Sequence, residues 1–268
     1  MDVRRRNNVI VTGRADGPVL VLAHGFGCDQ EMWRLVVPVL AAEYRLVLFD
    51  YVGCGRSDRA SWSEARYRSL DGYALDVVEV CAELGLERAT LVGHSVSAMI
   101  GVRAARLAPE RIGSLVMLAP SPRYIDDEGY RGGFSREDID ELLGSLEANH
   151  LGWSATAAPL IMGNPDRPEL ADELERSFCA TDPAVARVFA RATFLSDSRS
   201  ELPGVTVPTL VARCADDAIA PPEVADHVHA AVPGSRLVTL EATGHCPQLS
   251  APEATAEAIG EFVRAVAR

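Results

Sequence analysis

The sequence predicts an α/β fold with a mostly parallel central sheet, flanking helices and one inserted helical cap. Three observations predict it. Short apolar runs rich in Val, Ile and Leu alternate with stretches of helical length, as in sheets whose parallel strands are joined by helices. The alternation stops after Pro120 and resumes at Val205. Polar turns follow several strands at their C-terminal ends, the edge where sites form in open parallel sheets.

The expected strands are short and apolar on both faces, which is typical of strands buried between two layers of helices. They are Val9–Thr12, Val19–Ala23, Arg45–Phe49, Ala89–Val92, Ile112–Leu118, Val207–Ala212 and Leu237–Leu240. The expected helices carry apolar residues three or four positions apart. They are Glu31–Leu40, Leu70–Leu84, the Ala-rich stretch after residue 95, a helix opening at Pro221, and Pro252–Val266. Arg59–Tyr67 is polar and irregular, so we expect a loop there.

Residues 121–200 form the expected cap. They contain helical runs and no convincing strand pattern. The breakers that divide them are Gly132, Gly133, Pro159, Pro165, Pro168 and Pro183. We therefore divide the chain into a core of residues 1–120 and 201–268 and a cap, or lid, of residues 121–200. A chain of 268 residues that is 48% hydrophobic can bury one large core.

The composition excludes several classes of partner. A net charge of −12 argues against nucleic acid and against anionic membrane surfaces. No apolar run approaches the roughly 20 residues of a membrane-spanning helix, and no apolar signal segment follows the charged N-terminus. The six cysteines form no Cys-X-X-Cys pair. We therefore expect reduced thiols in a cytoplasmic protein that uses no metal and no cofactor.

The most informative motif is Gly93-His94-Ser95-Val96-Ser97, between an expected strand and an expected helix. This is the pattern of a nucleophile elbow, a strained turn that lifts one serine hydroxyl clear of the sheet. The flanking residues are small because the turn packs tightly, although the last of them is serine where glycine is commoner. Ser95 is therefore the candidate nucleophile.

A serine nucleophile needs a base, and the base needs a carboxylate that orients it. In this arrangement the chain order is Ser, then Asp or Glu, then His. Asp216 and Asp217 follow one late strand, and His245 follows the last one after Gly244. His245 is the candidate general base. One of the two aspartates is expected to orient His245 and the other to cap a helix or face solvent. Asp217 lies four residues before the helix-opening Pro221.

Acyl transfer also needs two fixed N–H donors where negative charge grows on the carbonyl oxygen. One is expected from Val96, the residue after the nucleophile. The other is expected from Phe26, in the turn His24-Gly25-Phe26-Gly27 that follows an early strand. The Phe26 ring is also expected to wall the pocket.

Other motifs have weaker claims to chemistry. The glycine-rich turn at residues 50–58 has Asp58 in place of the third glycine of a dinucleotide fingerprint, and the chain has no phosphate-binding P-loop. His94 is expected to point away from the nucleophile. His227 and His229 are two residues apart on an expected helix, so they face different sides and form no metal pair.

With these motifs the chain resembles the α/β-hydrolases from end to end. More narrowly, it resembles the RsbQ group of bacterial stress-signalling hydrolases and their relatives, the plant strigolactone and karrikin receptors. The stretches that carry the resemblance are residues 25–30 (GFGCDQ), 49–53 (FDYVG), 70–74 (LDGYA), 93–101 (GHSVSAMIG), 121–124 (SPRY), 132–134 (GGF), 178–183 (FCATDP) and 244–246 (GHC). The resemblance implies an α/β-hydrolase fold. It also implies a catalytic triad at Ser95, Asp217 and His245, and oxyanion donors at Phe26 and Val96.

The resemblance also implies a substrate pocket under the cap. Its expected walls are Phe26, Tyr124, Trp153 and Phe194. The plant receptors tend to carry an aromatic residue where this chain has Ala157, so their ligand is not transferred to it. A pocket of this kind favours a small apolar ester or lactone.

Two functions are consistent with these motifs. The first is a serine hydrolase of carboxylic esters or lactones; a haloalkane dehalogenase would need aspartate in place of Ser95. The alternative is a non-enzymatic or single-turnover ligand receptor that regulates a partner. The resemblance to the RsbQ group implies that this partner is a PAS-domain phosphatase in stress signalling.

Overall fold

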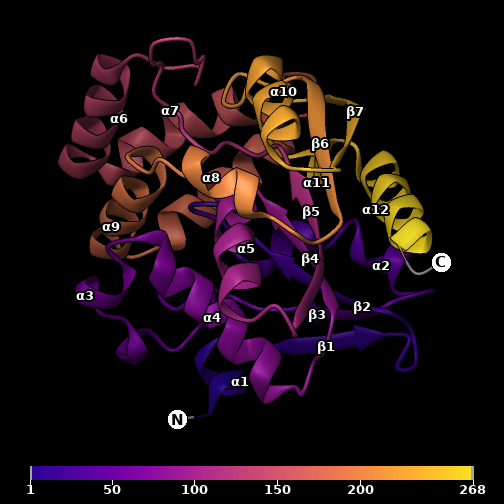
Figure 1. The fold of residues 1–268 in the computed structure, drawn as a ribbon. Helices are drawn as coiled ribbons and strands as arrows, with labels where there is room; N and C mark the ends of the chain where they lie inside the picture. The colour runs from indigo at the N-terminus through magenta and orange to yellow at the C-terminus, as the bar shows by residue number, and fades with distance from the viewer. Residues whose placement is uncertain (1, 267–268) are drawn as a thin grey trace.

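A computed structural model describes residues 2–266. A seven-stranded sheet runs through the molecule in the order β1-β3-β2-β4-β5-β6-β7, with only β1 antiparallel to its neighbour. The strands are β1 (Ile10–Gly13), β2 (Val19–Ala23), β3 (Arg45–Leu48), β4 (Ala89–His94), β5 (Ile112–Leu118), β6 (Thr209–Asp216) and β7 (Arg236–Thr243). Helices cover both faces, as Figure 1 shows. The expected mostly parallel α/β sheet is confirmed.

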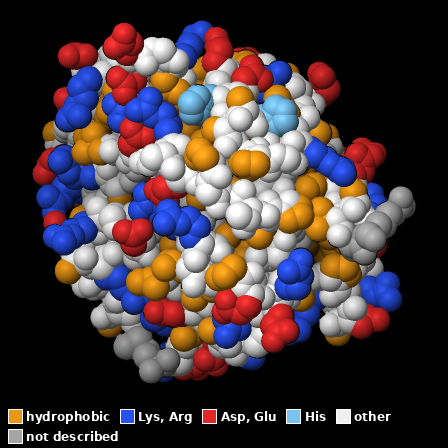
Figure 2. All heavy atoms as spheres, in the orientation of Figure 1, with side chains coloured by type: hydrophobic (Ala, Val, Ile, Leu, Met, Phe, Trp, Pro, Cys, Tyr) orange, Lys and Arg blue, Asp and Glu red, His pale blue; other side chains and the backbone are white. Residues whose placement is uncertain are grey.

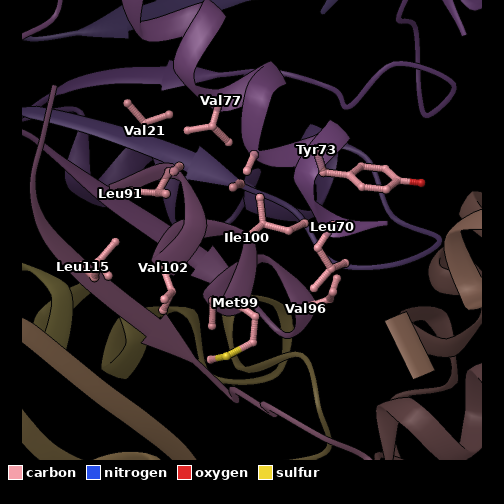
Figure 3. Packing of buried hydrophobic residues seen from close by; sticks show 14 of the residues in the cluster. Val21, Leu70, Tyr73, Val77, Leu91, Val96, Met99, Ile100, Val102 and Leu115 are labelled. Atoms are coloured by element: carbon pink, nitrogen blue, oxygen red, sulfur yellow. The ribbon is translucent and has the colours of Figure 1, made fainter. Parts of the chain in front are cut away.

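Alternate side chains of the central strands enter two separate apolar layers. Leu91 of β4 packs in one layer and the next residue, Val92, in the other. The helices of the first layer are α4 (Leu70–Glu83), α5 (Val96–Leu107) and α10 (Pro222–Ala231). The second layer holds η1 (Gln30–Trp33), α2 (Val37–Leu40), α11 (Pro247–Ser250) and α12 (Pro252–Val266). Figure 3 shows α5 in the first layer, with Met99 and Ile100 among its packed side chains. This packing fixes the start of α5 against the sheet.

Several short elements differ from the sequence expectations. The expected helix Glu31–Leu40 is two pieces, η1 and α2. Pro38 lacks an N–H and is favoured in the first turn of a helix, so a new helix begins there. The expected loop 59–67 contains the short turns η2 (Arg59–Ser61) and α3 (Glu64–Tyr67), and α1 (Val3–Arg6) was not expected.

Four helices lie over the carboxyl edge of the sheet, between β5 and β6 in the chain (Figure 1). They are α6 (Arg136–Ala148), α7 (His150–Met162), α8 (Pro168–Ala180) and α9 (Pro183–Phe194). The turn η3 (Arg199–Gly204) leads back to the sheet. Residues 121–200 contain isolated bridges and no strand. We call residues 121–200 the cap.

The surface carries acidic and basic side chains that are mixed on the face shown in Figure 2. Many of them are paired; for example, Arg103 bonds both Asp71 and Glu201. No helix among residues 2–266 is both long and apolar enough to cross a bilayer.

Candidate active site

Ser95 lies on a strained turn between β4 and α5. Its backbone has φ 58° and ψ −125°, a region that residues other than glycine rarely adopt. The Ser95 N–H donates to the carbonyl of Leu118 on β5 at 2.8 Å. A Cβ on Gly93 would lie 2.4 Å from the Ser97 carbonyl oxygen, so this position requires glycine. The turn therefore holds the Ser95 hydroxyl at the N-terminal end of α5.

The structure brings Ser95, His245 and Asp217 into one hydrogen-bonded chain. The His245 Nε2 atom lies 2.8 Å from Ser95 Oγ, and His245 Nδ1 lies 2.8 Å from Asp217 Oδ2. Because a carboxylate only accepts, His245 donates from Nδ1 and accepts the Ser95 proton at Nε2. All three residues are buried. The imidazole ring is thus held with Nδ1 on the carboxylate and Nε2 on the serine hydroxyl.

Of the two adjacent aspartates, only Asp217 reaches the histidine. Asp216 ends β6 and is exposed. Asp217 is buried and also accepts from the N–H groups of Ile219 and Ala220, at 2.8 and 3.1 Å. Burial alone would raise the pKa of Asp217, but interaction with His245 and these hydrogen bonds outweigh it and lower the pKa. Asp217 is therefore a carboxylate at neutral pH.

The two expected oxyanion donors belong to two segments that adjoin Ser95, the start of α5 and the turn after β2. Val96 is the first residue of α5, so its N–H has no acceptor within the helix. The Phe26 N–H has no hydrogen-bond partner among the described residues. It belongs to the turn after β2, where a Cβ on Gly25 would lie 3.4 Å from the Ser95 Cβ. Among residues 2–266, neither the Phe26 amide nor the Val96 amide has a hydrogen-bond acceptor.

An apolar cavity lies between Ser95 and the cap. Its wall contains all four of the expected pocket residues and several that were not expected. The lining residues are Phe26, Cys28, His94, Ser95, Tyr124, Phe134, Leu142, Trp153, Ala157, Leu160, Ile161, Leu174, Phe178, Thr193, Phe194, Ile219, His245 and Cys246. Among residues 2–266, no Asp, Glu, Lys or Arg side chain lines this cavity. Such a lining favours uncharged ligands.

Phe26 joins the core to the cap through aromatic contacts. Its ring centroid lies 5.6 Å from that of Phe194 and 6.1 Å from that of Trp153, both in edge-to-face geometry. Phe178 of α8 lies 6.0 Å away, and a Cβ on Gly27 would collide with its ring. Sequence reasoning did not place Phe178 in the pocket, because helical spacing alone does not tell a cavity wall from ordinary packing.

Tyr124 contributes more than the apolar wall that was expected. Its hydroxyl lies 3.2 Å from Ser95 Oγ. Burial raises the pKa of Tyr124, so the hydroxyl keeps its proton. A cap residue therefore places a hydrogen-bonding group beside the nucleophile, a contact that nothing in the sequence indicated.

The expectation that His94 points away from the nucleophile is wrong. His94 lines the cavity, and its ring lies 5.2 Å from that of His245. Its Nε2 donates to the His245 carbonyl at 2.7 Å. Burial and, to a smaller extent, the neighbouring His245 lower the pKa of His94 to about 3. His94 is thus a neutral donor that holds the backbone of His245.

The cap also touches the His245 loop directly. The His245 N–H donates to the Ile161 carbonyl at the end of α7, at 2.8 Å. The Asn164 side chain donates to the Thr243 carbonyl at 2.9 Å. Gly244 has φ 84°, and a Cβ there would collide with the Met162 carbonyl. The position of His245 is therefore set jointly by the core and by α7.

The remaining histidines and the cysteines have other surroundings. His227 packs against Tyr130, and His229 bonds Ser235. Residues 2–266 contain no group of three His, Cys, Asp or Glu side chains that could hold a metal ion. The six cysteines are free thiols. Cys28 and Cys246 line the cavity, and burial raises the pKa of both, so they are protonated.

Comparison with known proteins agrees with this geometry. The profile of the Alpha/beta hydrolase family matches residues 20–258. The chain belongs to the α/β-hydrolase family. This confirms the resemblance to the α/β-hydrolases.

The relatives of this α/β-hydrolase include plant proteins. It is 40% identical to a probable esterase from Oryza sativa subsp. japonica over 94% of this chain and 93% of that protein. It is 39% identical to a strigolactone esterase from Arabidopsis thaliana over 93% of each chain. A solved hydrolase from Oleispira antarctica is 42% identical and superimposes with a TM-score of 0.96, covering 98% of this chain and 96% of that one. The expected similarity to the plant receptor group is confirmed.

Proposed function

We propose that this α/β-hydrolase cleaves small, uncharged carboxylic esters or lactones through Ser95, His245 and Asp217. The observation that carries the proposal is the buried chain of two 2.8 Å hydrogen bonds from Ser95 to His245 and from His245 to Asp217. Nucleophile, base and orienting acid are the three groups that acyl transfer requires. Relatives whose names include "esterase" support the same reaction class.

The first half of the reaction forms an acyl-enzyme. As Ser95 Oγ attacks the carbonyl carbon, its proton passes to His245 Nε2, and Asp217 stabilises the resulting imidazolium. The carbonyl oxygen becomes an oxyanion that accepts from the Phe26 and Val96 N–H groups. His245 then gives the proton to the leaving alkoxy oxygen as the carbon–oxygen bond breaks.

The second half releases the acid. Water gives a proton to His245 Nε2 as its oxygen attacks the acyl carbon, and the same two amides hold the second oxyanion. The bond to Ser95 Oγ breaks and His245 returns the proton to that oxygen. With a lactone, the leaving alcohol stays attached to the acyl group, so the product is one hydroxy acid.

The cavity supports a small apolar substrate. Its wall is almost entirely aromatic and aliphatic, and Tyr124 is the main polar group that the cap adds near Ser95. A charged substrate would lose its hydration without gaining an opposite charge. Uncharged esters and lactones are therefore favoured over carboxylate-bearing ones.

Hydrolysis of p-nitrophenyl acetate by the pure protein tests the proposal. We expect turnover by the wild type and none above background by Ser95→Ala. We also expect a fluorophosphonate to add one adduct mass to the wild type and none to Ser95→Ala. Thermal melting shows whether the variant is folded. Turnover that persists in a folded Ser95→Ala protein would exclude the proposed nucleophile.

We propose a signalling use of the same site as the second candidate, because α7 touches the His245 loop through the Ile161 carbonyl. A ligand that shifts the cap would therefore change the position of His245, and a change at His245 would in turn shift the cap. Relatives named karrikin insensitive receptors support this use. The partner proposed from the RsbQ resemblance is a cytoplasmic PAS-domain phosphatase. Pull-down of the phosphatase with Ser95→Ala, in the presence and in the absence of a cavity ligand, tests this candidate. Failure to bind the phosphatase under both conditions would contradict it.

A further inference from the structure

The last residue of the elbow, Ser97, does more than fit a tight turn. Its side chain is completely buried, and its hydroxyl lies 2.8 Å from the hydroxyl of Tyr51. The same hydroxyl donates to the backbone carbonyl of His24. Glycine, the commoner residue at this place, could make neither contact. Ser97 therefore connects α5 to the turn after β2.

The direction of each hydrogen bond follows from the atoms involved. The His24 carbonyl can only accept, so the Ser97 hydroxyl must donate its single proton to it. Tyr51 is then the donor to Ser97. Burial raises the pKa of Tyr51, so its proton is present at any pH at which the protein is assayed. The chain Tyr51 to Ser97 to His24 is thus fully satisfied and has one possible orientation.

The ring of His24 ties the same turn a second time. Its Nδ1 lies 2.9 Å from the Gly25 carbonyl oxygen, which only accepts, so Nδ1 carries the proton. Its Nε2 accepts from the Tyr51 N–H at 3.2 Å. Burial lowers the pKa of His24, in keeping with a neutral ring. Residues 24 and 25 are therefore held at both the backbone and the side chain.

These contacts join the two halves of the proposed oxyanion site. Ser97 is adjacent to Val96, whose N–H is one donor, and His24 is two residues before Phe26, whose N–H is the other. We propose that Ser97, with Tyr51 behind it, is a positioning residue that fixes the distance between the two oxyanion donors. The inference rests on the proposed hydrolase function. Removing the Ser97 hydroxyl frees the His24 carbonyl and leaves only the ring contacts of His24 to hold this turn. We therefore expect the Phe26 amide to be held less firmly while the triad stays intact.

The test compares Ser97→Ala with a matched variant, Ser114→Ala. Ser114 of β5 is also buried and also shares a hydroxyl–hydroxyl bond of 2.8 Å, with Thr90, but lies away from the elbow. With p-nitrophenyl acetate we expect kcat of Ser97→Ala to fall about 10- to 100-fold, because outright loss of one oxyanion donor costs about 10²–10³-fold. We expect KM and the pH profile to stay as in the wild type. Ser114→Ala should keep the wild-type kcat.

Two further measurements separate positioning from general damage. A boronic acid that mimics the tetrahedral intermediate should bind Ser97→Ala more weakly by the same factor by which kcat falls. Tyr51→Phe, which leaves the elbow sequence unchanged, should show a smaller loss in the same direction and serves if Ser97→Ala does not fold.

The outcomes are distinct. A kcat of Ser97→Ala within twofold of the wild type, or a loss equal to that of Ser114→Ala, overturns the inference. A shifted pH profile would mean that the triad moved and would overturn it as well. Absence of turnover by the wild type would instead contradict the proposed function.

Discussion

The core and the cap meet at one cavity but contribute to it by different means. Ser95, Asp217 and His245 follow strand ends of the core and are fixed by hydrogen bonds of 2.8 Å. The cap contributes mainly apolar side chains such as Trp153 and Phe194, which contact Phe26 through ring edges. Hydrogen bonds to fixed atoms demand one geometry, whereas apolar contacts tolerate exchange of similar volumes. We therefore expect the core to set the reaction and the cap to set the choice of substrate.

Two hydrogen bonds join the cap directly to catalytic residues of the core. Tyr124 bonds the Ser95 hydroxyl, and the Ile161 carbonyl accepts from the His245 N–H. The cap is therefore part of the catalytic geometry at these two points. Substitution of a cap residue is expected to change KM without changing kcat only where that residue makes neither of these two hydrogen bonds.

The largest expected effect is loss of the core base. His245→Ala should lower kcat for every ester by at least about 10⁴-fold, since triad members act as one unit. Trp153→Ala in the cap should raise KM and leave kcat much closer to the wild type. Stopped-flow assays with p-nitrophenyl acetate give both constants. Equal losses of kcat in the two variants would show that the core and the cap do not differ in their roles.

The adjacent aspartates sharpen the comparison within the core. Asp217→Asn should lower kcat by about 10²–10⁴-fold, because an amide favours the wrong histidine tautomer. Asp216→Asn changes an exposed residue and should keep kcat within about twofold. Steady-state assays of both proteins, with melting temperatures as a check on folding, measure the difference. A larger loss in Asp216→Asn would mean that the wrong carboxylate orients His245.

The sequence predicted those parts of the molecule that local patterns determine. Each strand was found from its apolar run, and the chain order Ser, Asp, His placed three residues that the structure brings together. The choice of Asp217 over Asp216 rested on its distance from Pro221 together with the family resemblance. These features depend on neighbouring residues, so one sequence is enough to indicate them.

The features that the sequence did not predict depend on contacts between distant segments. The Tyr124 hydroxyl at Ser95 and the α7 carbonyl at His245 join residues 29 and 84 positions apart, which no periodicity reveals. His94 was misplaced because the residue before the nucleophile has no rule for its side-chain direction. The break at Pro38 was a missed local signal, since proline favours the first turn of a helix.

A change confined to the cap should alter selectivity without altering the chemistry. Ala157 is the smallest cap side chain in the cavity wall. Ala157→Trp should raise KM for p-nitrophenyl octanoate about tenfold or more and change p-nitrophenyl acetate much less, because it removes volume far from the reacting atoms. Leu151→Trp, on the exposed side of the same helix, is the control. Equal losses for both esters would show that the cap change disturbs the triad.

The smallest expected effect concerns stability and belongs to the core. Folding keeps His94 neutral down to a pKa of about 3, whereas an unfolded histidine binds a proton below about pH 6.5. The contribution of His94 to stability is therefore complete above pH 6.5 and is lost as the pH falls toward 3.

His94→Gln retains a donor for the His245 carbonyl and removes this titration. Between pH 7 and pH 5, the free energy of unfolding measured with urea should fall by roughly 2 kcal/mol less in His94→Gln than in the wild type. His227→Gln, at a half-buried histidine of α10, should show a smaller difference, since less burial means a smaller change on folding. If His94→Gln kept the pH dependence of the wild type, another core group would be the one that binds protons on unfolding.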